Sequence, residues 1–573
     1  MADITPPSEK IDEKRSEEGV SSGVDSLKSN TDIGPVWFET YLYYAALQRH
    51  EEDPKPPKGI SKLFYDLSSH KGSNVNIDIG PHIERERAIP LEEREAAARA
   101  LRLASWSSVF FLITTDILGP FNAPYAISQT GWVPGIILYF FMGAIAAYTG
   151  LILWRLYIRL DSNRYPIRSY GDIMHRIYGT TARRIANVMQ SIQLIIVVGI
   201  ICLANGQSVS QIAKGHICFS LAIIIWAIFG CVIGQIRTLR NYGWLANVAV
   251  WINLLIIFTA MGFVSHSPPN FSAAQSSLGV SPGPVVTEKF AKVPLFDQVN
   301  GIMNMLVKIL PFLSFVHPQF RVYAYGGAMI FPEMLAEMRR PMDFWKGMVM
   351  AQMLIFSAYL LFGAFVYSQQ GQFSLPLAYQ GVSKYAWQTI GNALSLITGI
   401  IAAGLYGNIG IKVVYHNIIV DWFHGPPLMS MKGRIIWSFL VLIYWSLAFV
   451  LGSAIPQVNT INGLVGAAGI MQFTYTFPPM LRFGYDVITD AMAGDGTYDP
   501  LTNQPYRVDT WRDWSRWKRG LFSGRWYFKL LNFGMTLAAI AMAALGLWAA
   551  GEAAKQTFAF QGAATSFGCT APV

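Results

Sequence analysis

Five charged residues lie inside long apolar stretches of this chain: Asp116, Lys308, Arg321, Glu333 and Lys412. A charge within the bilayer is costly, and ionisable residues kept there tend to line ion or substrate pathways. A partly desolvated carboxyl group can take up and release a proton. Asp116 and Glu333 are therefore candidates for proton coupling. The alternative is a static ion pair, such as Asp116 with Arg321 or Lys412.

Helix-breaking residues lie beside both carboxyl groups. Gly119-Pro120-Phe121-Asn122-Ala123-Pro124 follows Asp116, and Tyr323-Ala324-Tyr325-Gly326-Gly327 precedes Glu333, with Pro332 between. An interrupted membrane helix leaves free N–H groups that suit a carboxylate and free carbonyls that suit an ammonium. Such a pair of breaks would receive a zwitterion, although Gly and Pro also serve packing and kinks. The candidate binding residues are Gly119, Pro120, Phe121, Asn122, Ala123, Tyr325, Gly326 and Gly327.

The elements that would position these residues are apolar runs of about 20 residues, the length that crosses a bilayer. They fall at 105–129, 133–155, 186–206, 217–235, 243–264, 301–335, 347–367, 389–412, 434–454, 461–482 and 528–549. The two breaks lie in spans 1 and 6, which open two five-span halves. Because five is odd, the second half enters from the opposite side. Interrupted helices at matching places of inverted halves indicate a transporter site.

Composition agrees with an all-α polytopic membrane protein. Hydrophobic residues make up 52% of the 573 residues and charged residues 14%, about half the charged share of soluble proteins. The net charge of +9 comes from basic residues in short loops between apolar runs, a pattern of membrane orientation and not of nucleic-acid binding. We expect a tail at 1–102, a membrane domain at 103–550 and a short tail at 551–573.

Loop charges predict the orientation. The loops after even-numbered spans hold 22 Lys and Arg, and the remaining loops with the C-terminal tail hold 5. The positive-inside rule then places the N-terminus in the cytoplasm and the C-terminus outside. The glycosylation sequon Asn270-Phe271-Ser272 falls in a loop that this count places outside, where glycosylation occurs.

The polar segments carry further expectations. The N-terminal tail is predicted to be largely disordered at its start, with a helix at 91–104 entering the membrane. Between spans 10 and 11, tryptophans alternate with Arg512, Arg516, Lys518 and Arg519, which predicts a short helix on the cytoplasmic headgroups.

The sequence contains no motif that is typical of metal, redox or phosphate chemistry. The four cysteines form no CxxC and the nine histidines no HxxH or HExxH, so we expect neither a metal nor another cofactor and no enzyme. A Cys218–Cys569 disulfide is conceivable if both lie outside, but we do not favour it. No Gly-Lys-Ser/Thr phosphate loop occurs, which argues against ATP-driven pumping.

Several segments resemble the amino acid/auxin permease family, particularly its fungal members. They are TDILGPFNAPYA at 115–126 with GWVPG at 131–135, GQIRTL at 234–239 and FPEMLAEM at 331–338. The resemblance covers about residues 103–550. It implies eleven spans, a cytoplasmic N-terminus, the inverted-repeat fold of the bacterial leucine transporter and symport of amino acids with H⁺ or Na⁺.

Carried onto this chain, the resemblance implies that Gly119–Ala123 hold the substrate carboxylate and that Tyr325, Gly326 and Gly327 face its amino group. Sodium-coupled relatives use a Thr in span 8, where a short ungapped alignment places Ala403, so H⁺ is favoured over Na⁺. We expect a proton-coupled symporter of neutral amino acids, in the plasma membrane more than the vacuolar one. An amino-acid sensor with little flux and a Na⁺-coupled transporter are the alternatives.

Overall fold

The computed structural model describes residues 36–52, 102–290, 326–454, 466–561 and 567–569, apart from 103, 118–120, 122, 238, 376–377, 421–422, 427, 429 and 501. These residues form helices and no strand. Seven helices are long and apolar enough to cross a membrane, and two shorter apolar helices cover Trp106–Thr115 and Phe219–Ile233. The all-α, multi-span fold class is thereby confirmed, whereas the count of eleven spans stays a prediction.

Eight of the predicted spans coincide with single helices. These are α8 (Trp132–Leu160), α10 (Thr180–Ile212), α11 (Phe219–Ile233), α12 (Leu239–Ser265), α16 (Phe344–Gln370), α17 (Tyr385–Val414), α18 (Met431–Ala454) and α22 (Trp526–Gln561). Most are longer than predicted, because hydropathy marks only the part of a helix that lies in lipid. Helix α10, for example, begins at Thr180 and contains Arg183 and Arg184 before its apolar part.

Spans 1, 6 and 10 are irregular. Helix α6 (Trp106–Ile117) ends before the first Gly-Pro segment, and α7 (Ala123–Thr130) begins after it. In span 6, the short 3₁₀ helix η2 (Gly326–Ile330) leads into α15 (Phe331–Ala336), and residues 291–325 lie outside the described residues. Span 10 contains two π-helical segments, η7 (Gly466–Ile470) and η8 (Gln472–Thr476), followed by α20 (Phe477–Ala491).

The helices pack in two groups. Helix α10 packs against α11, α17 and α18, while α16 packs against α6, α7 and α8. Glycines bring the helices of the first group close together, as expected for membrane helices. Four of the five glycines of α17 face side chains of neighbouring helices: Gly399 faces Asn205, Gly404 faces Ile233 and Tyr242, Gly407 faces Trp445 and Gly410 faces Tyr444.

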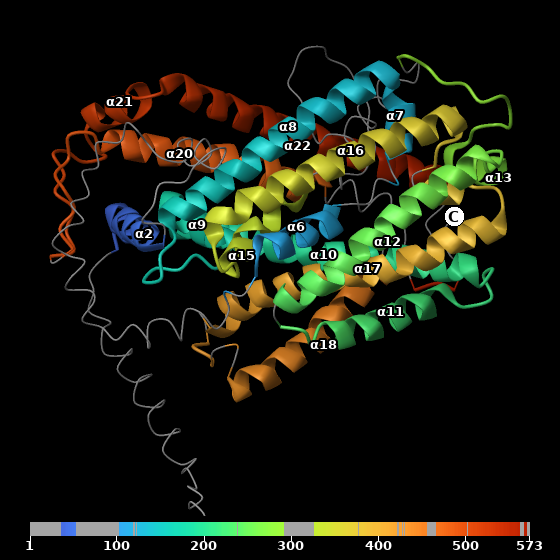
Figure 1. Ribbon diagram of the computed structural model, residues 1–573, viewed down its shortest axis with the longest axis horizontal. Helices are drawn as coiled ribbons and strands as arrows, with labels where there is room; N and C mark the ends of the chain where they lie inside the picture. The colour runs from blue at the N-terminus through green and yellow to red at the C-terminus, as the bar shows by residue number, and fades with distance from the viewer. Residues whose placement is uncertain are drawn as a thin grey trace, which may run out of the picture.

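Four further helices are short: α2 (Phe38–Glu52), α9 (Tyr170–Tyr178), which packs against α10, α13 (Phe271–Leu278) and α21 (Trp514–Phe522). In Figure 1, α2, α9, α20 and α21 gather at one end of the molecule, and α13 lies at the opposite end. Helix α2 belongs to the N-terminal tail. Residues 1–35 and 53–101 lie outside the described residues, as does most of the helix predicted at 91–104.

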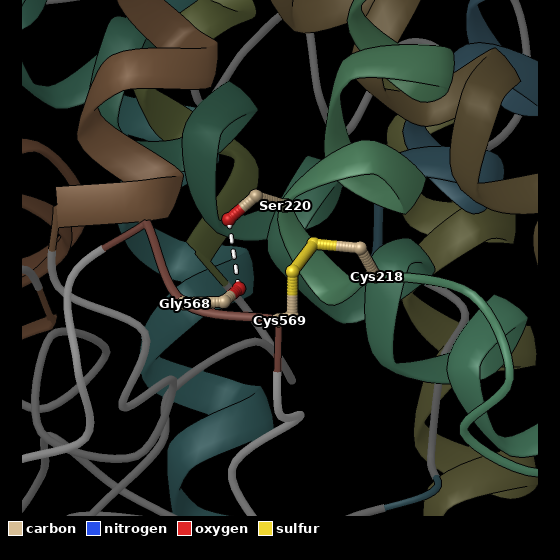
Figure 2. The surroundings of a disulfide bond; sticks show 4 residues. All are labelled: Cys218, Ser220, Gly568 and Cys569. Atoms are coloured by element: carbon tan, nitrogen blue, oxygen red, sulfur yellow. Dashed lines mark hydrogen bonds between the residues drawn. A yellow bond between two sulfur atoms is a disulfide. The ribbon is translucent and has the colours of Figure 1, made fainter.

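A disulfide joins Cys218 to Cys569, 351 residues apart in the chain. Figure 2 shows the C-terminal segment crossing the start of α11, where Ser220 donates a hydrogen bond to the Gly568 carbonyl (2.9 Å). Two backbone bonds extend this contact, from Phe219 to Cys569 (3.0 Å) and from Phe567 to Ser453 at the end of α18 (3.1 Å). Our expectation against this disulfide is wrong, because spacing in sequence does not reveal a tail that folds back onto the domain.

Candidate functional site

The interruption between α6 and α7 lies against α16. A Cβ built on Gly363 of α16 would come within 3.0 Å of the Ala123 Cβ at the start of α7. Phe121 occupies the interruption itself, and its ring contacts those of Phe362 (5.9 Å between centroids) and Tyr379 (5.4 Å). Gly119, Pro120 and Asn122 lie outside the described residues. The start of α7 is thus fixed from one side by close packing.

Helix α6 is fixed from two sides. A Cβ on Gly347 of α16 would stand 2.6 Å from the Trp106 carbonyl, so these two backbones are in close contact. On another side, the Thr115 hydroxyl donates to the Ala246 carbonyl of α12 (2.8 Å). Asp116 follows Thr115 near the end of α6, but its side chain lies outside the described residues. Its proposed pairing with Arg321 lies outside them too.

The second interruption leads directly to Glu333. Gly326 and Gly327 form the first turn of η2, and Pro332 lies in the first turn of α15; Tyr325 lies outside the described residues. Because proline lacks an N–H, it is well placed where a helix begins. Glu333 is 7% exposed, so this short helix carries its carboxyl group into the protein interior.

Neutral donors hold the Glu333 carboxyl group. One oxygen accepts hydrogen bonds from the Tyr170 backbone N–H (3.0 Å) and from the Gln190 side chain (2.7 Å), and Gln190 also donates to the Met329 carbonyl (3.0 Å). The other oxygen has no hydrogen-bond partner within the described part of the chain. A buried carboxyl group with a spare oxygen can bind a proton without breaking these bonds.

Sequence reasoning missed Tyr170 and Gln190. Helix α9 carries no hydropathy signal, and Gln190 falls within an apolar run of α10 like many packing residues. One signal was available at the start of α9, where Ser169 and Asp172 form a capping box. That motif predicts a helix start, but not the glutamate that its first N–H group meets.

The start of span 1 is joined to the end of the second broken segment. Ala104, just before α6, donates to the Glu337 carbonyl (2.9 Å) and accepts from the Arg339 N–H (2.9 Å). The Glu337 carboxylate pairs with Lys412 of α17. The static pair considered between Asp116 and Lys412 stays a prediction, because the Asp116 side chain lies outside the described residues. These backbone bonds hold the entry of α6 against the segment that follows α15.

Three other residues of interest cap a helix or are buried among packed helices. Asn270 caps α13 by accepting from the Ala273 N–H (3.3 Å), and its side-chain amide donates to the Gln380 carbonyl (3.2 Å). Asn205 of α10 is buried against Gly399. Ala403 is buried within α17. Glycosylation of Asn270 stays a prediction.

The helix predicted on the headgroups forms, but its basic residues divide into two sets. Arg516 is 1% exposed in its side chain and pairs with Asp495 (2.8 Å) and Asp509 (3.0 Å), and Arg519 pairs with Asp509 (2.7 Å). Arg512 and Lys518 are exposed. The headgroup role predicted for Arg516 is wrong, because its guanidinium group is buried and paired with two aspartates of the protein.

The fold and this arrangement define a multi-span membrane protein whose first span is broken between α6 and α7 and whose start is bonded to the segment after α15. The chain belongs to the transmembrane amino acid transporter protein family, whose sequence model matches residues 102–485. The resemblance seen in the sequence is thereby confirmed. The family is one of membrane transporters, so this chain is an integral, multi-pass membrane protein with amino acids as the family's small-molecule substrates.

Curated relatives are distant but cover most of the chain. A transmembrane transporter of Fusarium pseudograminearum is 22% identical over 72% of this chain and 80% of its own length. The N amino acid transport system protein of Neurospora crassa is 23% identical over 68% and 78%. Amino acid transporter AVT1B of Arabidopsis thaliana is 33% identical, over 13% of each chain.

Two solved structures align with most of the chain. A Na⁺-coupled sialic acid symporter in a substrate-bound outward-open state aligns at a TM-score of 0.42, with 9% identity over 79% of this chain and 92% of its own. The nucleobase-cation-symport transporter Mhp1, with bromovinylhydantoin bound, aligns at 0.42, with 14% identity over 80% and 94%.

Proposed function

We propose that this protein is a secondary active transporter that carries neutral amino acids together with protons by alternating access. What supports the proposal is the break between α6 and α7, with the 3₁₀ turn η2 at the position of the second predicted break, in a chain of this family. Helix α6 stops at Ile117 and α7 starts at Ala123, and the second interruption leads into η2 and α15. Both lie in the first span of a five-span half, the arrangement in which transporters place their sites.

The proposed site holds the two charges of an amino acid separately. The start of α7 offers the positive end of a helix dipole and free N–H groups, which suit the substrate carboxylate. Gly119–Ala123 would hold that group. Carbonyls at Tyr325, Gly326 and Gly327 would accept from the substrate ammonium. Phe121 would stay near the substrate, since Phe362 and Tyr379 hold its ring.

Glu333 and Asp116 are the proposed proton carriers. Glu333 is supported by its burial, its neutral donors and its spare oxygen. It also lies one turn past the second interruption, so a change of its protonation would act on η2 through Gln190, which bonds both Glu333 and the Met329 carbonyl. For Asp116 the support is its position at the end of α6 alone. Ala403 in span 8 supports H⁺ over Na⁺.

Uptake of a labelled amino-acid panel into proteoliposomes, under an imposed pH or sodium gradient, tests the transport proposal. We expect uphill uptake of neutral amino acids with a proton gradient. Uphill uptake driven by sodium alone would contradict proton coupling. Binding without flux for every amino acid would favour the alternative, a sensor of the same fold.

Glycine variants test the site. We expect Gly119→Val and Gly326→Val to reduce uptake at least about 100-fold, since a branched side chain would fill the cavity beside the substrate. Gly262→Val is the matched control, because a Cβ at Gly262 of α12 meets no atom within 4 Å. Near-normal uptake in both site variants would remove these glycines from the site.

Carboxyl variants test the coupling. Glu333→Gln keeps an acceptor oxygen for Tyr170 and Gln190 but cannot bind or release a proton. We expect it to abolish uphill uptake while exchange of labelled for unlabelled substrate continues. Asp116→Asn should flatten the pH dependence of uptake if that residue carries the proton. Unchanged uphill uptake in Glu333→Gln would reject Glu333 as a carrier.

The cell-level part of the proposal is a plasma-membrane location with the N-terminus in the cytoplasm. The loop charges and the sequon at Asn270 support the orientation. Removal of N-glycans from the protein made in a eukaryotic host should increase its mobility on a gel, and Asn270→Gln should abolish that change. A glycan-free wild-type chain would withdraw this support for the orientation.

A further inference from the structure

Helix α2 of the N-terminal tail lies across two loops that come from different halves of the chain. One is the loop 161–169 between α8 and α9, and the other is the loop 492–513 between α20 and α21. Figure 1 shows α2 beside α9 at the end of the molecule where α20 and α21 also lie. The charge count places both loops in the cytoplasm.

Helix α2 contacts the loop 492–513 mainly through one ion pair. Arg507 donates two hydrogen bonds to the Glu39 carboxylate (2.8 and 2.9 Å), and its guanidinium group lies over the Trp37 ring (4.8 Å). Glu39 is 7% exposed. Next to this pair, Thr40 donates to the Asn503 side chain (3.4 Å). A bidentate pair of this kind fixes the orientation of both partners.

The opposite end of α2 contacts the loop 161–169. Arg49 pairs with Asp161 (3.0 Å), and the Gln48 side chain accepts from the Asn163 N–H (2.5 Å). Between the two ends of α2, the Arg176 guanidinium group lies over the Tyr41 ring (4.5 Å). Helix α2 therefore spans from one loop to the other by charged and aromatic contacts. It also buries a small apolar face that includes Leu42 and Leu47. Because the ion pairs at its two ends involve buried carboxylates, breaking one of them should loosen the whole helix.

Asp161 connects this helix to the first broken span. Its fully buried carboxylate accepts from Arg49 (3.0 Å), from Arg102 (3.1 Å) and from the Ile167 N–H (3.0 Å). Arg102 lies two residues before Ala104, whose backbone pairs with Glu337 and Arg339 beyond α15. One buried carboxylate thus holds both α2 and the entry of α6.

We propose that α2 is a detachable latch on this face of the transporter. When docked, it holds the loops of the two halves together and fixes the start of α6, which restrains the opening of this face. Residues 53–101 separate α2 from the membrane domain, so a released α2 stays tethered and redocks by an intramolecular event. The transport readout of this proposal rests on the proposed function; the structural readout does not.

Charge reversal at Glu39 and Arg507 tests the latch. In the full chain in nanodiscs, Glu39→Arg and Arg507→Glu should each raise amide exchange in 38–52 at least about tenfold. They should also raise exchange in 106–117 at least about twofold. The double reversal should bring both segments back to within about threefold of wild type. Lys432→Glu is the control, because it reverses an exposed charge outside this contact.

Transport gives the second readout, with the labelled amino acid that the wild type takes up fastest. We expect each single reversal to raise the initial rate at saturating substrate about threefold, because opening of this face is no longer restrained. A crosslink between Thr40→Cys and Asn503→Cys should lower the rate at least about fivefold, and reductant should restore it. Wild type with the same reductant controls for Cys218–Cys569.

Three outcomes would overturn the latch. Unchanged exchange in 38–52 after both single reversals would show that the ion pair does not hold α2. Raised amide exchange in 38–52 with no change in 106–117 would show that release of α2 does not affect α6. Full uptake by the crosslinked chain would show that docking restrains nothing. If wild type carries no amino acid, the proposed function fails and the exchange data still decide the link.

Discussion

The two ends of this molecule are held together by different chemistry. We call one the ion-pair end, formed by α2, the loop 161–169 and the loop 492–513, and the other the disulfide end, formed by Cys218, Ser453 and Phe567–Cys569. Salt bridges and cation–aromatic contacts join the first. A covalent bond and backbone hydrogen bonds join the second.

This difference fits the compartments that the loop charges assign. Disulfides persist in oxidising surroundings and are rare in the cytosol, and Cys218 and Cys569 lie on the side that the charge count places outside. The two free cysteines, Cys202 and Cys231, lie within α10 and α11. Ion pairs and aromatic contacts join the ion-pair end, and a covalent bond joins the disulfide end.

The largest effect is expected at Arg516, whose side chain is 1% exposed between Asp495 and Asp509. Arg516→Met would leave Asp495 without its cation and Asp509 with Arg519 alone. Removing one member of a buried ion pair costs about 3 kcal/mol or more. We expect the variant to unfold at a clearly lower temperature in a detergent thermal-shift assay.

Lys518→Met is the control for Arg516→Met. Lys518 lies on the same helix but is exposed, so its replacement should leave the unfolding temperature within about a degree. Equal stability of the two variants would mean that the buried ion pairs contribute nothing to holding the ion-pair end.

Breaking the disulfide should have the next largest effect. Its loss frees the C-terminal segment from α11 and α18 and removes a constraint on the unfolded chain, which is worth about 2–4 kcal/mol. We expect Cys569→Ser, or reductant on the wild type, to lower the unfolding temperature and to expose 562–573 to proteolysis. Cys202→Ser with Cys231→Ser should remain fully sensitive to reductant. If reductant left the unfolding temperature of the wild type unchanged, the disulfide would not stabilise the disulfide end.

Sequence reasoning predicted the lipid-embedded part of the fold well, because an apolar run of about 20 residues matches the thickness of a bilayer. Helices α8, α12 and α18 lie where hydropathy places them. It also placed the first interruption, because Gly119-Pro120 disfavours helix for a local, steric reason. The family followed from short motifs around the same residues.

What the sequence did not reveal depends on contacts between distant segments. Nothing near Cys218 indicates that Cys569 returns to it, and nothing in the alternation of tryptophans and basic residues indicates that Arg516 turns inward to Asp495 and Asp509 of the preceding loop. Glu333 was singled out by its charge, yet its partners Tyr170 and Gln190 come from elements 163 and 143 residues away. Helix α2 was hidden in the same way, since its stability comes from the loops on which it docks.

The smallest effect is expected in the loss of stability of the ion-pair end at low pH. Hydrogen bonds from Arg519 and Arg516 hold the pKa of Asp509 well below its ordinary value. A carboxyl group whose folded-state pKa is depressed stabilises the fold at pH values above its unfolded pKa, which is about 4 for Asp. That stabilisation is lost as the pH falls towards the folded-state value, because the unfolded chain then binds the proton first.

Comparison of wild type with Asp509→Asn over a pH series tests this. The wild type should unfold at a higher temperature by a constant margin from about pH 7 to pH 5, and the margin should shrink below about pH 4. The disulfide does not titrate in this range, so Cys569→Ser should differ from wild type by the same margin at every pH. A margin for Asp509→Asn that stays constant down to about pH 3 would mean that Asp509 is not held in ionised form by its arginines. The ion-pair end would then differ from the disulfide end in bond type without differing in its response to acid.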